Sequence, residues 1–227
     1  MRRWLWLLIS FAGPAQAGPP AVIEVAYEMS RDGSVMADVV ERLEHGGGRY
    51  QIAETTKGRG IYALIGSMKR TSRGQLDARG VRPLEFTDER PAPGWRDSRA
   101  LFDWAARTIT MHHKQVERTV PMPPDAQDQL SFMLAFAFFP PKGTTFAYNI
   151  ADSRSVSEQI YRVAGEEKLR VPAGEFQTLK LVRIKDSGSA ELWLAKELGN
   201  FPVRAVVVDK DGRRLEQSAV RISTSSP

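Results

Sequence analysis

Histidine and cysteine are the residue types that would most directly indicate a metal site or nucleophilic catalysis, and this chain has three histidines and no cysteine. His112 and His113 are adjacent, so on a strand their rings would point to opposite faces and could not bind one metal ion together. No Asp or Glu lies within three residues of the pair, and His45 stands beside a triple glycine typical of a turn. We therefore predict no metal site and no cofactor.

The serine and carboxylate patterns that support hydrolysis are also weak. Ser131 lies in Leu-Ser-Phe, without the glycines of a nucleophile elbow. The acidic pairs Asp88-Glu89, Glu166-Glu167 and Asp125/Asp128 could perform acid–base chemistry if two carboxylates converged, but solvated turns or a helix start explain them as well. The sequence shows no catalytic constellation. We predict that the protein is not an enzyme, with an envelope hydrolase as the least favoured alternative.

One segment suggests a different chemistry, the binding of an apolar group. Residues 125–139 follow prolines, carry acids at their start and stop at Pro140-Pro141, which predicts a helix. At 100° per residue, one face carries Leu130, Met133, Leu134, Ala137 and Phe138, and a nearly opposite face carries Phe132, Phe136 and Phe139. A helix that is apolar all round must be covered on more than one side. An alternating strand over Phe132 to Phe138 also fits the pattern.

Two interpretations of this helix remain open. It could be a plug that fills the concave side of a curved sheet, with its phenylalanine face covered by loops. Alternatively, that face could border a groove for a lipid or a lipoprotein acyl chain, which makes Phe132, Met133, Phe136 and Phe139 the candidate ligand-binding residues.

The rest of the chain predicts the sheet that would position this helix. Val171 to Ile222 contains four extended segments, rich in β-branched and aromatic residues and separated by turn residues at 186–189, 199–200 and 209–212, as in consecutive antiparallel strands. Upstream, alternating segments such as Ile23 to Met29 and Val35 to Leu43 end in turn signals, and another strand is expected over Ile61 to Met68.

The total comes to about 13 or 14 strands and one helix, too many for a flat sheet. We predict a mainly β fold: a large antiparallel up-and-down meander, curled into an open barrel or sandwich, with the apolar helix packed on its concave side.

The first residues have the pattern of a secretory signal peptide. Arg2 and Arg3 precede an apolar run from Trp4 to Ala12, and small residues follow at Ala15 and Ala17. About nine apolar residues cannot cross a bilayer core that needs roughly 20. We expect cleavage after Ala17, a single β-rich domain over residues 18–227 without a membrane span, and, in a Gram-negative host, a soluble periplasmic protein.

Charge argues against nucleic acid as a partner. Loss of Arg2 and Arg3 with the signal would lower the formal charge from +5 to +3, and basic and acidic residues are interleaved along the expected strands. Such a pattern is typical of a mixed solvated surface.

Several motifs, taken in order, resemble the DUF3108 family of uncharacterised exported bacterial proteins. They are Arg79 to Phe86, Phe102-Asp103-Trp104, Asp128-Gln129-Leu130-Ser131, Val171 to Phe176, and Leu192 to Ala195 with Phe201 to Arg204. The resemblance implies an exported, mostly antiparallel β protein with a curved sheet, and it implies no activity. Taken alone, these motifs are explained by stability: Pro172 and Gly174 build a turn, and Phe102 and Trp104 share a strand face.

Two functional hypotheses follow. The first is a non-enzymatic periplasmic binding or carrier module for an apolar ligand such as a lipid or acyl chain. The alternative is a structural or interaction protein of the cell envelope that docks on a partner protein through an edge strand or the helix, because an edge strand exposes unpaired backbone groups.

Overall fold

The computed structural model describes residues 20–78, 80–91, 98–139, 143–184 and 189–225. The expected signal peptide, residues 1–17, lies outside the described residues, as does most of the expected turn at 186–189. None of the described helices is long and apolar enough to cross a membrane.

The described strands form one 15-stranded sheet, ordered β8-β7-β6-β5-β4-β3-β2-β1-β15-β14-β13-β12-β11-β10-β9. The last of these strands in sequence pairs with the first, so two meanders extend from a shared centre, and the β9–β10 pair is parallel whereas the other described pairs are antiparallel. The strands are β1 (Val22–Arg31), β2 (Ser34–Gly46), β3 (Arg49–Gly58), β4 (Ser67–Asp77), β5 (Gly80–Glu89), β6 (Arg99–Asp103), β7 (Thr108–His113), β8 (Val116–Pro121), β9 (Ala126–Asp128), β10 (Thr145–Ala151), β11 (Val156–Val171), β12 (Gly174–Ile184), β13 (Ser189–Ala195), β14 (Phe201–Val208) and β15 (Arg214–Ser225).

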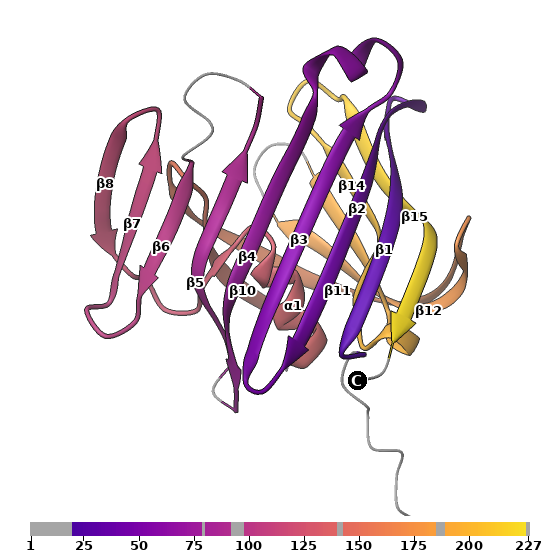
Figure 1. Cartoon of the computed structure of the whole chain (residues 1–227). Coiled ribbons are helices and arrows are strands. Elements are labelled where there is room, and N and C mark those ends of the chain that lie inside the picture. The colour runs from indigo at the N-terminus through magenta and orange to yellow at the C-terminus, as the bar shows by residue number, and fades with distance from the viewer. Residues whose placement is uncertain (1–19, 79, 92–97, 140–142, 185–188, 226–227) are drawn as a thin grey trace, which may run out of the picture.

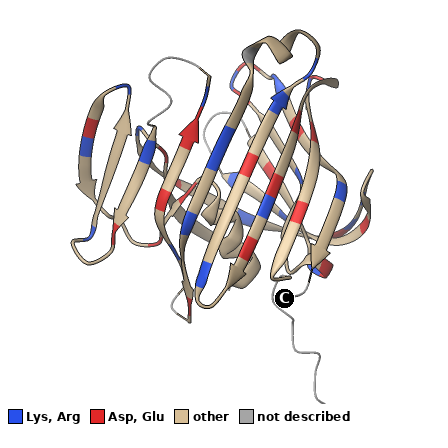
Figure 2. Cartoon of the chain, in the orientation of Figure 1, with Lys and Arg blue, Asp and Glu red and all other residues tan. Residues whose placement is uncertain are grey.

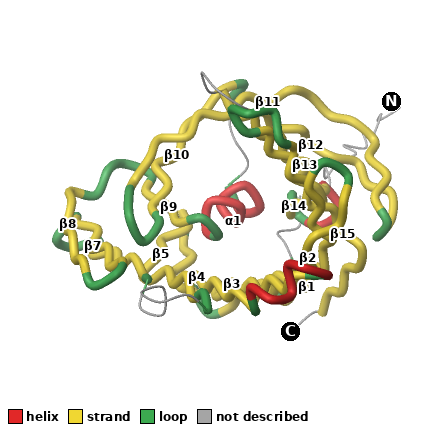
Figure 3. The backbone as a smooth tube through the Cα atoms, turned by 90° about the horizontal axis from the view of Figure 1, so that it is seen from above, coloured by secondary structure: helices red, strands yellow, loops and turns green. Residues whose placement is uncertain are grey.

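The sheet curls around the helix α1 (Ser131–Phe138), as Figures 1 and 3 show. Its ends do not pair to close the barrel, because β8 and β9 are the two edges. Instead, β9 packs against β5, where Gln127 Nε2 donates a hydrogen bond to the carbonyl oxygen of Val81 at 2.9 Å. Strands β6 to β8 extend beyond this seam (Figure 3). The predicted open, curled meander with a helix on its concave side is therefore confirmed.

The helix is shorter than the expected range of residues 125–139. Ala126–Asp128 forms β9 instead, and Asp125, which precedes it, has a positive φ of 50°. The helix begins only at Ser131, because the Asp128 carboxylate accepts the backbone N–H groups of Leu130 and Ser131.

The expected strand over Ile61 to Met68 is wrong in its first half. Gly60–Ile65 forms a 3-10 helix, η1, and β4 begins at Ser67. The chain folds back so closely here that a Cβ on Gly58 would lie 2.1 Å from the carbonyl oxygen of Tyr62. A second 3-10 turn, η2 (Lys196–Leu198), precedes β14.

Two further strand boundaries differ from expectation. The segments expected at 155–164 and 167–171 form one strand, β11, whose pairing with β12 shifts register between Val163 and Gly165. Strand β8 was not expected; five of its six side chains are exposed, so it lacks the alternation that marks a half-buried strand.

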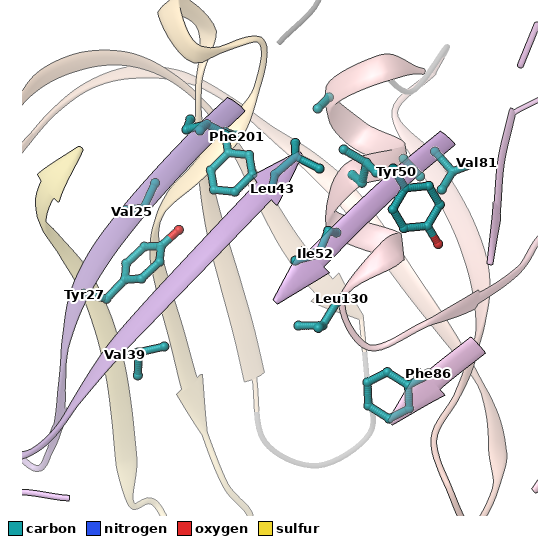
Figure 4. Close-up of a cluster of buried hydrophobic side chains, with 14 of the residues drawn as sticks. Val25, Tyr27, Val39, Leu43, Tyr50, Ile52, Val81, Phe86, Leu130 and Phe201 are labelled. Atoms are coloured by element: carbon teal, nitrogen blue, oxygen red, sulfur yellow. The ribbon is translucent and has the colours of Figure 1, made fainter. Parts of the chain in front are cut away.

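Two apolar clusters fill the interior, and each contains residues of α1. The larger joins buried residues of both meanders, most of them from β1 to β3, β5 to β7 and β14, to Leu130, Leu134 and Ala137; part of it is drawn in Figure 4. The smaller contains Phe132 and Phe136 with inward residues of β10 to β13. Full burial of one large apolar side chain contributes about 1.5–3 kcal/mol. The helix thus covers the concave faces of both meanders.

Basic and acidic residues are interleaved along neighbouring strands of the sheet (Figure 2). Ion pairs include Arg59–Asp38, which joins the turn after β3 to β2, and the cross-strand pair Lys180–Glu191. Pairs that remain accessible to solvent contribute about 0–1 kcal/mol each.

Candidate ligand-binding site

The start of α1 is fixed by a buried polar network around Asp128. Its Oδ1 accepts the N–H groups of Leu130 and Ser131, both at 2.8 Å, and its Oδ2 accepts the Ser72 hydroxyl of β4 at 2.6 Å. Ser72 in turn contacts the Tyr50 hydroxyl at 3.0 Å. Burial raises the pKa of Asp128 to about 6, although these hydrogen bonds oppose the shift. The motif at 128–131 is therefore a clamp between sheet and helix.

Two of the four predicted ligand-binding residues pack against protein. Phe136 is fully buried, and its ring lies 5.5–6.0 Å from the rings of Phe132, Phe146, Tyr148 and Tyr161. Phe132 stacks on Tyr161 at 6.1 Å. These separations are typical of aromatic packing in a core. In the described structure, Phe132 and Phe136 fill the space between α1 and β10 to β13, as expected of a plug, although strands rather than loops cover them.

The other two predicted residues line two different cavities. Phe139, 36% exposed, lines the cavity beside the seam between β5 and β9, here called the seam cavity. Met133 lines a second cavity between the two meanders, here called the ionic cavity. The structure therefore does not bring the four residues together in one groove.

The seam cavity has a volume of about 340 Å³, within the range of roughly 300–1,000 Å³ typical of small-molecule sites. Three aromatic rings, those of Trp104, Phe139 and Tyr148, form much of its lining. The complete lining is Gly80, Val81, Arg82, Trp104, Asp125, Gln127, Ala135, Phe139 and Tyr148.

Polar groups stand among these rings. The Arg82 guanidinium lies 5.3 Å from the centroid of the Trp104 ring, whose Nε1 donates to the carbonyl oxygen of Pro83 at 2.7 Å. Burial, with a smaller contribution from Asp125, raises the pKa of Tyr148 to about 12, so its hydroxyl stays protonated. Gln127 Oε1 is buried and has no hydrogen-bond partner within the described part of the chain. An unpaired buried acceptor of this kind can receive a ligand donor.

Sequence reasoning missed most of this cavity. Arg82 and Trp104 belong to motifs that stability alone explained, and Tyr148 and Gln127 carried no signal. The cavity forms where β5 and β9 meet, and that contact depends on the curvature of the whole sheet. Two segments that line the cavity, at 79–86 and 102–104, did belong to the ordered family motifs, but those motifs did not indicate a cavity.

The ionic cavity has a volume of about 180 Å³. In register, Glu41 of β2 lies opposite Glu54 of β3, and Glu54 lies opposite Arg70 of β4. Arg70 Nε donates to Glu54 Oε1 at 2.9 Å, and Arg70 Nη1 donates to Gln129 Oε1 at 3.1 Å. The remaining lining residues are Tyr27, Leu130, Met133, Pro202, Arg204, Ala205 and Gln217.

Glu41 is the unusual member of this cavity. Its side chain is buried, with 5% of the residue exposed, and its Oε1 has no hydrogen-bond partner among the described residues. Burial, and then the negative charge of Glu54, raise the pKa of Glu41 to about 8, while Arg70 opposes the shift. The sequence did contain a signal: Glu41 has the same phase as the inward Val39 and Leu43, where an acid is out of place.

A larger depression, about 700 Å³, is a surface feature at the end of β2 to β4. Two of the charged side chains in its lining already have partners: Glu44 pairs with Arg42 at 2.7 Å, and Arg73 donates to Gln51 at 2.9 Å. We therefore do not treat it as the site.

The histidines and acidic pairs singled out in the sequence make local contacts. His112 Nε2 lies 3.3 Å from Glu117 Oε2, and His113 Nδ1 lies 3.1 Å from the Ser98 hydroxyl. In the acidic pairs at 88–89 and 166–167, Asp88 forms an ion pair with Arg90 and Glu166 forms one with Lys196. Glu167 accepts a hydrogen bond from Trp193 Nε1. Among the residues described, no three His, Asp or Glu side chains are grouped to hold a metal ion. The absence of a cofactor stays a prediction.

Comparison with known proteins identifies a family but no activity. Two solved structures are similar, each 10% identical: a Bacteroides fragilis protein described as a candidate exported protein with a YmcC-like fold (TM-score 0.40; 89% of this chain and 95% of that chain covered), and a Parabacteroides distasonis protein described as a candidate lipoprotein (TM-score 0.36; 92% and 96%). No match to a curated protein was found. The model of the family described as "Protein of unknown function (DUF3108)" matches residues 24–218, so the chain belongs to this family.

Proposed function

We propose that this protein is an exported, periplasmic binding or carrier module for an apolar ligand with an acidic head group, such as a fatty acid or a lipid acyl chain, and that the ligand occupies the seam cavity. The observation that carries the proposal is the convergence of Trp104, Phe139 and Tyr148 around about 340 Å³ of space. Concave sites lined by aromatic rings with a few polar groups are typical of small-molecule binding.

The polar groups support the choice of head group. Arg82 lines the cavity and presents a planar guanidinium, which suits a carboxylate or a phosphate. Tyr148 adds a hydroxyl donor for the same anion, whereas the unpaired Gln127 Oε1 only accepts and would suit a hydroxyl group of the ligand. A ligand carboxylate near Arg82 would leave its apolar chain against Trp104 and Phe139. Phe132 and Phe136 would then act from the interior, by holding Tyr148 and the helix in place.

Titration calorimetry with dodecanoate tests this proposal. Phe139→Asp places a charge in the cavity and should weaken binding by at least about tenfold. The matched control is Leu64→Asp, because Leu64 is 92% exposed on η1 and lines none of the cavities described above. Arg82→Gln should weaken binding of dodecanoate but not of dodecanol. Equal affinity for dodecanoate in the unmodified protein and Phe139→Asp would refute the proposal.

The alternative, docking on an envelope protein through an edge strand, has less support. One edge of the described sheet, β9, has three residues, all buried. The other, β8, exposes Val116 at 66% but also carries Glu117, Arg118 and Pro121, which are typical of edges protected against strand addition. Crosslinking in cells from position 119 of β8 would favour this function if it captured one specific protein, and that capture was lost on replacing Val116 with Asp.

A further inference from the structure

Two carboxylates, Glu41 and Glu54, and two guanidinium groups, Arg70 and Arg204, line the ionic cavity. Glu54 pairs with Arg70, and Arg204 Nε lies 2.8 Å from Oε1 of Glu216 without hydrogen-bond geometry, while Glu216 also pairs with Arg214. Glu41 is the lining carboxylate for which the described residues provide no ion pair. Asp88, next along the row on β5, pairs with Arg90 at 2.7 Å and does not line the cavity.

A buried carboxylate without a partner is costly to ionise, so burial favours the protonated form of Glu41. The protonated acid still leaves Oε1 without a partner in the described structure. This unpaired atom belongs to a residue that lines the cavity, so it can accept a hydrogen bond from a bound donor. Arg70 and Arg204 lie against Glu54 and Glu216, so a donor that carries a positive charge would supply the counter-charge that Glu41 lacks.

We propose that the ionic cavity binds a small organic ammonium ion, and that the positive charge of this ion replaces the proton on Glu41. A metal ion is less suitable, because no three metal-binding side chains are grouped among the described residues. The volume of about 180 Å³ corresponds to roughly six water molecules at about 30 Å³ each. It admits an amine of a few heavy atoms, whose N–H groups can donate to Glu41, Glu54 and the Gln217 side chain.

This exchange makes ammonium binding dependent on pH. Below the pKa of Glu41, about 8, each bound ammonium ion releases about one proton, so affinity should rise about tenfold per pH unit from pH 6 to 8 and then level off. The other charged or titratable groups in the lining are Tyr27 on β1, Glu54 on β3, Arg70 on β4 and Arg204 on β14. Burial raises the pKa of Tyr27 well above 10, so it stays neutral across this range. Strand β15 and α1 contribute the neutral Gln217 and Met133.

Calorimetric titration of the full chain with ethylamine, from pH 6 to 9, tests the proposal. Repeating the titration in two buffers with different ionisation enthalpies counts the protons released. We expect binding, release of about one proton per ethylamine at pH 7, and no release above pH 9. Ethanol, the neutral analogue of the same shape, should not bind. Absence of ethylamine binding, or binding with no proton release at pH 7, would overturn the proposal.

Variants assign the effect to Glu41. Glu41→Gln keeps the side-chain volume but cannot become an anion, so it should abolish the proton release and weaken ethylamine binding at pH 8.5 at least tenfold. Glu44→Gln is the matched control, because it removes an exposed carboxylate from the outer face of the same strand and should bind like the unmodified chain. Equal affinity in Glu41→Gln and Glu44→Gln would also contradict the proposal. If Glu41→Gln does not fold, the proton count on the unmodified chain decides the question.

Discussion

Glu41 and Glu54 lie directly opposite each other on the inner faces of β2 and β3, and among the described residues a cationic partner, Arg70, is found for Glu54 but not for Glu41. Two carboxylates at neighbouring inward positions cannot both ionise at low cost. The pair therefore divides into an ion-paired carboxylate and a neutral acid. This arrangement places a titratable group in the interior of a sheet whose inward positions are otherwise mainly apolar.

The first prediction concerns pH and stability. The pKa of Glu41 rises from 4.5 to about 8 on folding, so between these values the folded state binds more protons than the unfolded state. The free energy of unfolding should then fall as pH rises through this window, with Glu41 contributing a slope of at most about 1.4 kcal/mol per pH unit. Urea unfolding at pH 6, 7 and 8 measures the slope. Glu41→Gln should flatten it and Glu44→Gln should not; identical slopes would remove Glu41 as the cause.

The second prediction separates the two phenylalanines of α1. Phe136 is completely buried among four aromatic rings, so Phe136→Ala should lower the free energy of unfolding by about 3–5 kcal/mol. Phe139 is partly exposed at the end of the helix, and Phe139→Ala should cost about 1 kcal/mol or less. Urea denaturation of both variants tests this contrast. A similar loss at both positions would show that the helix end is as tightly packed as its centre.

The difference between these residues also shows what the sequence could predict. Alternation along strands such as β1 and β2 correctly indicated the inward faces, because each strand has one buried side. Helical periodicity correctly separated Leu134 from Phe136, which lie in different clusters. It could not show that Phe136 would meet β10 to β13 while Phe139 would lie at the seam. That distinction depends on contacts between β5 and β9, which are distant in sequence.

Local backbone geometry was the second feature that the sequence did not predict. Residues 125–128 carry helix-start signals, yet three of them form a strand that pairs with β10, because tertiary pairing overrides local propensity. Likewise, the alternation around Ile61 did not reveal a 3-10 turn, in which Ile61 and Leu64 are exposed. The inward orientation of Glu41 could be predicted from the alternation along its strand. Its position opposite Glu54 could not, because the sequence does not show which residues of two paired strands face each other.

The third prediction tests the clamp at the start of α1. Asp128→Ala removes the acceptor of two backbone N–H groups and of the Ser72 hydroxyl, and should lower the free energy of unfolding by about 2 kcal/mol or more. Asp128→Asn keeps one oxygen for the backbone donors and should cost less. Thermal and urea unfolding of both variants give the comparison. If alanine is tolerated as well as asparagine, the helix does not depend on this cap.

The fourth prediction concerns the turn that connects β3 with η1. A Cβ at Gly58 would lie 2.1 Å from the carbonyl oxygen of Tyr62 and 2.9 Å from the backbone nitrogen of Ala63, and backbone atoms cannot move aside as a flexible side chain can. Gly58→Ala should therefore displace η1 and lower the free energy of unfolding by about 1–3 kcal/mol.

Gly46 is the matched control for this substitution, because it also ends a strand but has no atom within 4 Å of an added Cβ. Gly46→Ala should change the free energy of unfolding by less than about 0.5 kcal/mol. Proteolysis adds a local measurement: η1 exposes Leu64, and its release should speed cleavage near residue 64 in Gly58→Ala alone. Equal stability and equal cleavage in the two variants would mean that the chain can pass from β3 to β4 without the close approach of residues 58 and 62, so that glycine is not required there.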